Sequence, residues 1–459
     1  MELYDRPIGP ETYAAIRFGT GFPLRGAPAT AEAMLNRLAG PDRVAAAYPR
    51  LSFDEGIALG TAVREAMRQA RKNMAGGAEA VKVAHRALAA ARGAGFVLEL
   101  ARHVETDDPF RERLVRFWEN HFAAASRRGA HVAAASGYAD EAIRPHIAGP
   151  FSTLLKSAVT HPFLMMYLDQ PESVGPNSRK GLRHGRGLNE NLAREVLELH
   201  TLGVGGPYTQ ADVTEFAELL TGLHFTGKKG FAFQPGMAEP GAETVLGRTY
   251  GGDKPELADI HAVLDDLAVH PSTAAFVCRK LAVHFVADDP DPDLIAFMQA
   301  AYRVSGGHLT RVYAAMLEHP ASWRGFGAKV KTPMEFMTSG LRALGARAAD
   351  LDKLGPNHVR KRLLRPLRLM GQPYQRPPGP DGFADDAEAW VQPFGLAGRI
   401  GWAMRAARSL GQLAPDPREF VRTALGDATS GRLIWAAGAA ETRPDGVGVV
   451  LASAEFNRR

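Results

Sequence analysis

The stretch that decides the fold runs from residue 187 to residue 223 and reads GLNENLAREVLELHTLGVGGPYTQADVTEFAELLTGL. Its first half carries Leu192, Val196 and Leu199 at the i, i+4, i+7 spacing of one face of an α-helix. Asn189 precedes this stripe, where an amide side chain caps the free N–H groups of a first helical turn. The pattern predicts an amphipathic helix that packs its apolar face into a core.

The second half of the same stretch predicts a tight turn and another helix. Gly203 follows the first helix, where glycine is favoured because it adopts the left-handed cap conformation without strain. Thr209 and Asp212 have the spacing of a capping box, and apolar residues at helical spacing follow them. We therefore expect an αα-hairpin with a glycine-rich elbow, which is typical of a mainly helical protein.

Helix start signals recur along the chain. Thr30 precedes one helical pattern, and Asp108 and Thr332 precede two others. The last two are each followed by proline, which is favoured at the first helical position because it has no N–H group to leave unsatisfied. These signals predict helices in the N-terminal, central and C-terminal parts of the chain.

Three further segments complete the expected architecture. The Ala-rich stretch 54–104 predicts two or three helices that break near the glycine pair 76–77 and near Gly93. Residues 224–252 contain short β-prone runs around glycine turns and predict a small β-hairpin insertion. Residues 371–390 are rich in Pro and Gly and predict a loop. The fold class is therefore mainly α, a compact multi-helix, bundle-like single domain over 1–459.

Polar residues occupy the face of the central helix opposite the apolar stripe. Asn191, Glu195 and Glu198 are spaced so that their side chains converge, and Arg194 can pair with Glu198 one turn away. His200 lies two residues after Glu198, about 200° around an ideal helix, and so falls on the apolar side. A metal site here would therefore need the helix to end before His200, or a second segment to contribute.

Two interpretations of this polar face stay open. In the first, Arg194 and two glutamates form a buried ion-pair network that is capped by Asn191. In the second, the carboxylates bind a divalent metal or act as acid and base. Two carboxylates one turn apart repel each other unless a cation or a proton lies between them. Arg194 is itself such a cation, so both interpretations use the same residues.

A second polar group falls in FWENHF, residues 117–122. A histidine on an apolar helical face, such as His121, is typical of a core histidine with one hydrogen-bond partner. Its polar companions Trp118 and Asn120 also admit a role in a site. The loop 167–187 precedes the central helix and contributes Asn177, which is placed to fold over the polar face.

Composition limits the classes of function. The chain of 459 residues is 45% hydrophobic and 23% charged, and its net charge is +5, which does not argue for nucleic acid as a partner. It has neither a Walker A motif nor a GxGxxG motif after a strand. The single cysteine, Cys278, excludes an intramolecular disulfide and a thiolate zinc cluster, and its neighbours predict that it is buried.

The sequence also bears on location and partners. No stretch approaches 18 apolar residues, so we expect no membrane span. The first residues carry acidic groups and no long apolar run, unlike a secretory signal, so we expect a cytoplasmic protein. The partners remain unknown, and a protein partner stays open.

The motifs resemble a bacterial family known as domain of unknown function number 1800. The residues that carry the resemblance are GLNENLAREVLELHTLGV (187–204), GGPYTQADV (205–213), FWENHF (117–122), HPFLMMYLD (161–169), GPNS (175–178) and KLAVHFVADDP (280–290). It extends from Ile16 to Phe456. It implies no reaction and no catalytic residues. Many members look exported beside a partner family that is also exported, whereas this chain shows no such signal.

Two functional hypotheses follow. The first is an enzyme with a carboxylate and histidine pocket, which performs metal-assisted or acid–base hydrolysis, with a carbohydrate among the candidate substrates. The second is a non-enzymatic binding or assembly protein in which the polar helix is a buried structural network. For the enzyme we predict Glu195, Glu198, His200 and His121 as catalytic, Asn120, Asn191, Arg194, Tyr208 and Asn177 as substrate-binding, and Glu195, Glu198 and His121 as ligands of a divalent metal.

Overall fold

Helices begin at the capping residues that the sequence indicates. Thr30 accepts a hydrogen bond from the Ala33 N–H at 3.2 Å and starts α2 (Ala31–Ala39). Asp108 caps α6 (Pro109–His121) through the Arg111 N–H. Thr332 forms a complete capping box with Glu335 at the start of α17 (Pro333–Ala343). The predicted helix starts are therefore confirmed, because each side chain satisfies N–H groups that a first helical turn leaves free.

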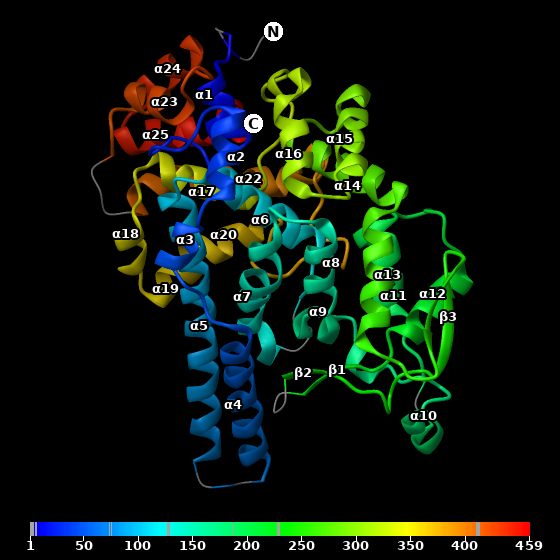
Figure 1. Cartoon of the computed structure of the whole chain (residues 1–459). Coiled ribbons are helices and arrows are strands. Elements are labelled where there is room, and N and C mark those ends of the chain that lie inside the picture. The colour runs from blue at the N-terminus through cyan, green and yellow to red at the C-terminus, as the bar shows by residue number, and fades with distance from the viewer. Residues whose placement is uncertain are drawn as a thin grey trace.

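The structure is a computed structural model that describes residues 4, 7–72, 74, 76–125, 129–185, 187–226, 230–409 and 414–459. Figure 1 shows a mainly helical molecule with short strands at one side, which confirms the predicted fold class. Other helices in the first part of the chain, with 3-10 and π-helical segments labelled η, are α1 (Pro10–Thr12), η1 (Tyr13–Arg17), α3 (Arg43–Ala47), η2 (Gly129–Ala134), α7 (Ala135–Tyr138), η3 (Ala139–Ile143), η4 (Arg144–His146), α8 (Phe151–Val159), α9 (Pro162–Tyr167), η5 (Gln170–Glu172) and α10 (Arg179–His184).

The later helices follow the same order along the chain. They are α13 (Leu257–Val269), α15 (Pro292–Val304), α16 (Leu309–Glu318), η7 (Pro320–Trp323), α18 (Ala348–Asp352), α19 (Pro356–His358), η8 (Val359–Leu364), α20 (Arg365–Leu369), α21 (Ala387–Trp390), α22 (Pro393–Ser409), α23 (Pro417–Leu425), α24 (Gly431–Gly438), α25 (Arg443–Ala452) and α26 (Ala454–Asn457). Among the described residues, no helix has both the length and the apolar surface needed to cross a membrane.

The Ala-rich stretch forms a long helical hairpin that projects from the body of the molecule (Figure 1). Its helices are α4 (Phe53–Arg71) and α5 (Gly77–Glu105), so the predicted break near Gly76 is present, with φ +77° at that glycine. The predicted break at Gly93 is wrong, because α5 runs through it without interruption. One glycine inside a helix costs only about 1 kcal/mol, which the helical residues on either side offset.

The β insertion consists of two hairpins instead of one. Strands β1 (Leu223–Thr226) and β2 (Gly230–Phe233) pair antiparallel, and β3 (Gly241–Val245) pairs antiparallel with β4 (Arg248–Gly252). The strands are only four or five residues long, and each hairpin forms its own two-stranded sheet. Such short hairpins are marginal alone, so their stability depends on packing against the neighbouring helices.

Two large apolar clusters form the core. One contains the apolar residues of α6, α8, α9 and α12 (Gln210–Leu219), together with those of α13–α16. The other contains the second half of α5 and the helices from α17 to α25. Cys278, on α14 (Pro271–Phe285), is buried in the first cluster, as its neighbours predicted. Helices α5 and α6 contribute to different clusters, so the contact between them joins the two halves of the core.

Helix α6 carries four charged residues that are buried or partly buried, and one of them pairs with α5. Arg111, Glu112 and Arg113 are each no more than 6% exposed, and Arg116 is partly buried. The pairs are Arg111 with Asp108, Glu112 with Arg144 at 2.6 Å, Arg113 with Glu335 at 3.0 Å and Arg116 with Glu99 at 2.6 Å. Removing one partner of a buried ion pair costs about 3–5 kcal/mol. These pairs therefore determine where α6 lies.

Glycine substitutions in the projecting arm, which is the hairpin of α4 and α5, test how closely these helices are packed. A Cβ added at Gly56 would lie 2.4 Å from the Ala134 Cα, whereas one added at Gly93 would have no neighbour within 4 Å. Gly56→Ala should therefore lower the free energy of unfolding by about 1–3 kcal/mol through overpacking. The matched change Gly93→Ala should raise it by about 0.5–1 kcal/mol, because alanine is the better helix former. Urea denaturation at an unchanged m-value measures both, and equal effects in the two variants would contradict the described packing.

Candidate functional site

The central helix has an unusual geometry at its end. Helix α11 (Asn191–Glu195) continues directly into a π-helical turn, η6 (Val196–Thr201). Leu192 and Val196 are buried, as the apolar stripe predicted, whereas Leu199 is only half-buried and Leu197 is buried instead. Gly203 has φ +90°, as expected for a left-handed cap. A π-helical turn adds a residue to the turn and changes which side chains share a face, and such turns are frequent at functional sites.

An ion-pair network covers the outer side of this helix. The Arg194 guanidinium donates to Glu190 at 3.0 Å and to Glu198 at 3.5 Å, and it also donates to Gln210 on α12 at 2.9 Å. The Arg194 side chain is 39% exposed. The interpretation of a buried network is therefore corrected in two respects: the network lies at the surface, and its second glutamate is Glu190 instead of Glu195.

Glu195 stands apart from this network. Among the described residues, no hydrogen bond or ion pair to its half-buried carboxyl is present. Burial raises the pKa of Glu195 to about 7, and the negative charges of Glu198 and Asp381 contribute to the rise against the opposing effect of Arg194. Near neutral pH the carboxyl is therefore present in both its protonated and its ionised form, which suits proton transfer in either direction.

Asp381 reaches Glu195 because the Pro- and Gly-rich loop docks on the end of α6. The Asn120 side chain donates to the Phe383 carbonyl oxygen at 2.8 Å and accepts from the Phe383 N–H at 2.7 Å. Gly382 has φ +82°, and a Cβ there would lie 2.5 Å from the Asn120 carbonyl oxygen, so only glycine fits between them. The two-point contact aligns the loop and brings Asp381 into the environment of Glu195.

Lys280 on α14 adds a cation to this group. Burial lowers the pKa of Lys280, and the carboxylates of Asp385 and Asp381 oppose that effect. The Lys280 ammonium lies 5.4 Å from the centre of the Phe276 ring, and Gly203 packs against the same ring. The end of the central helix, α14 and the loop therefore meet at Lys280.

Two predicted histidines, His121 and His200, lie together near Lys280. The His121 Nε2–H donates to the His200 carbonyl oxygen at 3.0 Å, and the two ring centres are 6.0 Å apart. Burial and the Lys280 charge lower the pKa of His200 to about 3, and burial keeps that of His121 well below its ordinary value. Within the described part of the chain, neither His200 ring nitrogen has a hydrogen-bond partner. Both rings are therefore neutral at physiological pH.

The other predicted residues are more scattered. Tyr208 faces Glu198, whose charge adds to the effect of burial in raising the pKa of the tyrosine. Asn191 is exposed, and its backbone N–H donates to the Asn189 side chain at 2.9 Å. The Asn177 side chain donates to Glu239 at 2.6 Å, so its amide is committed to another segment.

The predicted metal ligands do not form a compact set. A metal ion needs ligand atoms that lie close together. The carboxylate and imidazole atoms of Glu195, Glu198 and His121 do not form a group in which all lie within 4.8 Å of one another. Within the described residues, that criterion is met by Glu215, Glu218 and Glu243, which join α12 to β3.

The sequence did not indicate two residues of the site, Asp381 and Lys280. Asp381 lies in a stretch whose composition indicates only a loop, and Lys280 lies in a helix without any chemical motif. The local signal near Asp381 is the glycine that follows it, because an Asp-Gly pair marks a tight turn. No local signal relates either residue to Glu195, since they are separated from it by 186 and 85 positions respectively.

The fold and the site define a mainly helical protein with a partly buried group of titratable residues at the end of its central helix. The family model described as Protein of unknown function (DUF1800) matches residues 26–458, and the chain belongs to this family. No curated protein and no solved structure matches the chain. The comparisons therefore show the family and no reaction.

The contact between Asn120 and Phe383 can be tested directly. Asn120→Ala removes two hydrogen bonds and should release the loop, so amide hydrogen exchange within 371–390 should accelerate about tenfold or more, in line with a loss of about 1–3 kcal/mol. Asn177→Ala removes one side-chain hydrogen bond, that to Glu239, and should leave exchange in the loop unchanged. Faster exchange of the loop in both variants would mean that Asn120 has no specific role in holding it.

Proposed function

We propose that this protein is an acid–base enzyme of hydrolytic type, with Glu195 as the group that transfers the proton. The proposal is carried by one observation: Glu195 is half buried, is free of ion pairs among the described residues, and has a pKa of about 7 beside Glu198 and Asp381. A carboxyl that only stabilised the fold would be expected to be ionised and paired. Perturbed groups of this kind cluster at functional sites.

The three carboxyl groups have different roles in this proposal. Glu198 pairs with the Arg194 guanidinium at 3.5 Å, which holds its carboxylate in place beside Glu195. Glu195 takes a proton from an attacking water when it is ionised, or donates one to a leaving group when it is protonated. Asp381 raises the proton affinity of Glu195 and, because it lies on a loop, comes from the side on which a substrate would approach.

Lys280 and the two histidines support the same centre. The Lys280 ammonium lies near Asp381 and is positioned to stabilise negative charge that develops on a substrate oxygen. His121 and His200 are neutral and buried, and we assign them to positioning the end of the helix. We favour the acid–base form over the metal-assisted form because the atoms of Glu195, Glu198 and His121 do not converge.

The pKa of Glu195 gives a prediction about stability. Its folded-state pKa of about 7 exceeds the ordinary 4.5, so the folded protein binds this proton more tightly than the unfolded chain does. The ionised group therefore opposes folding, and stability is lost as the pH rises from about 4.5 through about 7. Glu195→Gln should be more stable than wild type at pH 8, and the gain should shrink towards pH 4.

The matched change Glu198→Gln should have the opposite sign. It removes the partially exposed ion pair with Arg194 and should cost about 0–1 kcal/mol at pH 8. Urea denaturation of both variants at the two pH values measures these differences. Marked destabilisation by Glu195→Gln at pH 8 would show that the carboxylate is structural, and would favour the non-enzymatic binding or assembly protein.

Hydrolytic activity tests the function itself. We expect the purified protein to cleave at least one member of a panel of p-nitrophenyl glycosides and esters, with an ionisation near pH 7 in the profile of kcat/KM. Glu195→Gln should lower kcat by about 100- to 10,000-fold, which is the usual contribution of general acid–base catalysis. The control Asn177→Ala should retain activity. Full activity of Glu195→Gln, or no cleavage across the panel, would overturn the proposal.

A further inference from the structure

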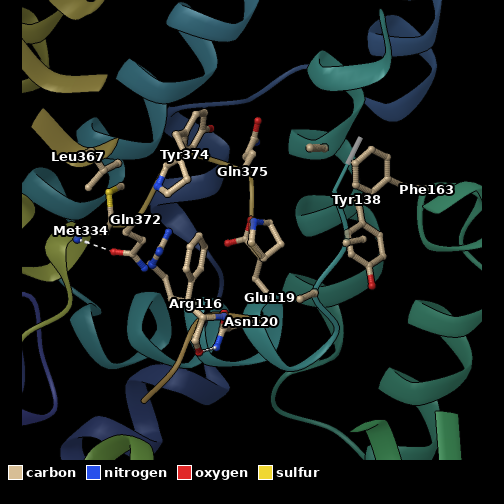
Figure 2. Close-up of a pocket in the computed structure, with 16 residues that line it drawn as sticks. Arg116, Glu119, Asn120, Tyr138, Phe163, Met334, Leu367, Gln372, Tyr374 and Gln375 are labelled. Atoms are coloured by element: carbon tan, nitrogen blue, oxygen red, sulfur yellow. Dashed lines mark hydrogen bonds between the residues drawn. The ribbon is translucent and has the colours of Figure 1, made fainter. Parts of the chain in front are cut away.

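A cavity lies against the same loop that carries Asp381 (Figure 2). It is a hollow that is partly open to solvent, and its empty space is about 630 Å³ when the open part is included. Its walls come from the end of α6, from α7 and α9, and from loop residues between 372 and 383. Asn120 and Phe383, which fasten the loop, are both part of its lining.

Aromatic side chains from three different segments line the cavity. Tyr138 belongs to α7, Phe163 to α9 and Phe383 to the loop. The Tyr138 hydroxyl is already used, because it donates to the Phe122 carbonyl oxygen at 3.1 Å. These rings therefore contribute apolar surface on more than one side, which suits a ligand with C–H groups exposed on its faces.

The polar lining offers both donors and acceptors that the protein does not use. Within the described residues, no hydrogen bond to the Glu119 carboxyl is present, and Gln375 uses only its amide N–H₂, which donates to Ser136 at 3.1 Å. Gln372 uses only its oxygen, which accepts from the Met334 N–H at 2.8 Å. Glu119 and Gln375 can thus accept hydrogen bonds from a ligand, while Gln372 can donate one.

Charge in the cavity is balanced. Glu119 and Arg116 lie one turn apart on α6 and both line the cavity, and the Arg116 guanidinium is already paired with Glu99 at 2.6 Å. A strongly anionic ligand would face Glu119, and a strongly cationic one would face Arg116. The lining therefore favours a neutral ligand that presents several groups able both to donate and to accept hydrogen bonds.

We propose that this cavity binds an uncharged saccharide unit, whose hydroxyl groups bond Glu119, Gln372 and Gln375 while its ring packs against the aromatic side chains. The inference rests on the proposed function, for which it names the substrate class. The sequence named Asn120 as a binding residue, but it did not indicate the cavity that Asn120 lines. Binding and turnover are assigned to different residues, so the two proposals can fail separately.

Saccharide binding tests the inference on the full chain. Isothermal titration calorimetry and saturation-transfer NMR would use cellotriose, maltotriose and chitotriose, with free lysine and glucuronate as charged probes. We expect at least one neutral trisaccharide to bind wild type. Gln375→Leu should weaken that binding about tenfold through the loss of one hydrogen bond, and Ala124→Phe should abolish it by filling the cavity. The matched variant Gln69→Leu, on the projecting arm, should bind as wild type does.

The outcomes separate the cavity from the catalytic centre. Glu195→Gln should keep the binding while it loses turnover. If it keeps both while the cavity variants lose binding, the saccharide site stands and the proposed role of Glu195 fails. If no neutral trisaccharide binds, if only a charged probe binds, or if binding survives both Gln375→Leu and Ala124→Phe, the inference is overturned.

Discussion

Helix α6 holds the charges of Arg111, Glu112, Arg113 and Arg116 in the interior of the protein, where breaking one ion pair costs several kcal/mol. Each charge is paired, and three of the partners come from helix α5, from the segment after residue 129 and from helix α17. The pairs therefore act as alignment points between segments that are far apart in the sequence. An apolar interface of the same area would allow α6 to slide or rotate more easily, because apolar contacts have little directional preference.

The last turn of α6 depends on this alignment. It places Asn120 where the loop 371–390 can dock, and it places His121 against the carbonyl oxygen of His200. The loop in turn brings Asp381 to Glu195, so contacts made on a different helix add to the effects of burial and of Glu198 on that carboxyl. The cavity and the titratable group lie against the same loop, so in both of our proposals this loop contributes to the site.

Much of the fold could be predicted from the sequence, because its signals are local. Thr30, Asp108 and Thr332 cap helices as expected, and Gly203 has the left-handed conformation that its position predicted. The exception, Gly93, shows the limit of such signals: a weak helix breaker remains helical when the residues on both sides favour the helix. The outer pairing of Arg194 with Glu198 was also predictable, since both residues lie on one helix.

By itself, the sequence determined the helical class, several helix starts and the chemical character of the central helix. It also determined the loop, except that the last residues of the predicted range 371–390 form helix α21 (Ala387–Trp390). All of these depend on residues within one or two turns of each other. Only the tertiary structure decided that the pKa of Glu195 is raised, that Asp381 lies near both Glu195 and Lys280, and that Glu119 lines a cavity. The physical reason is that burial and electrostatic interaction depend on distance in space, and the residues concerned are brought together only when the loop docks on α6.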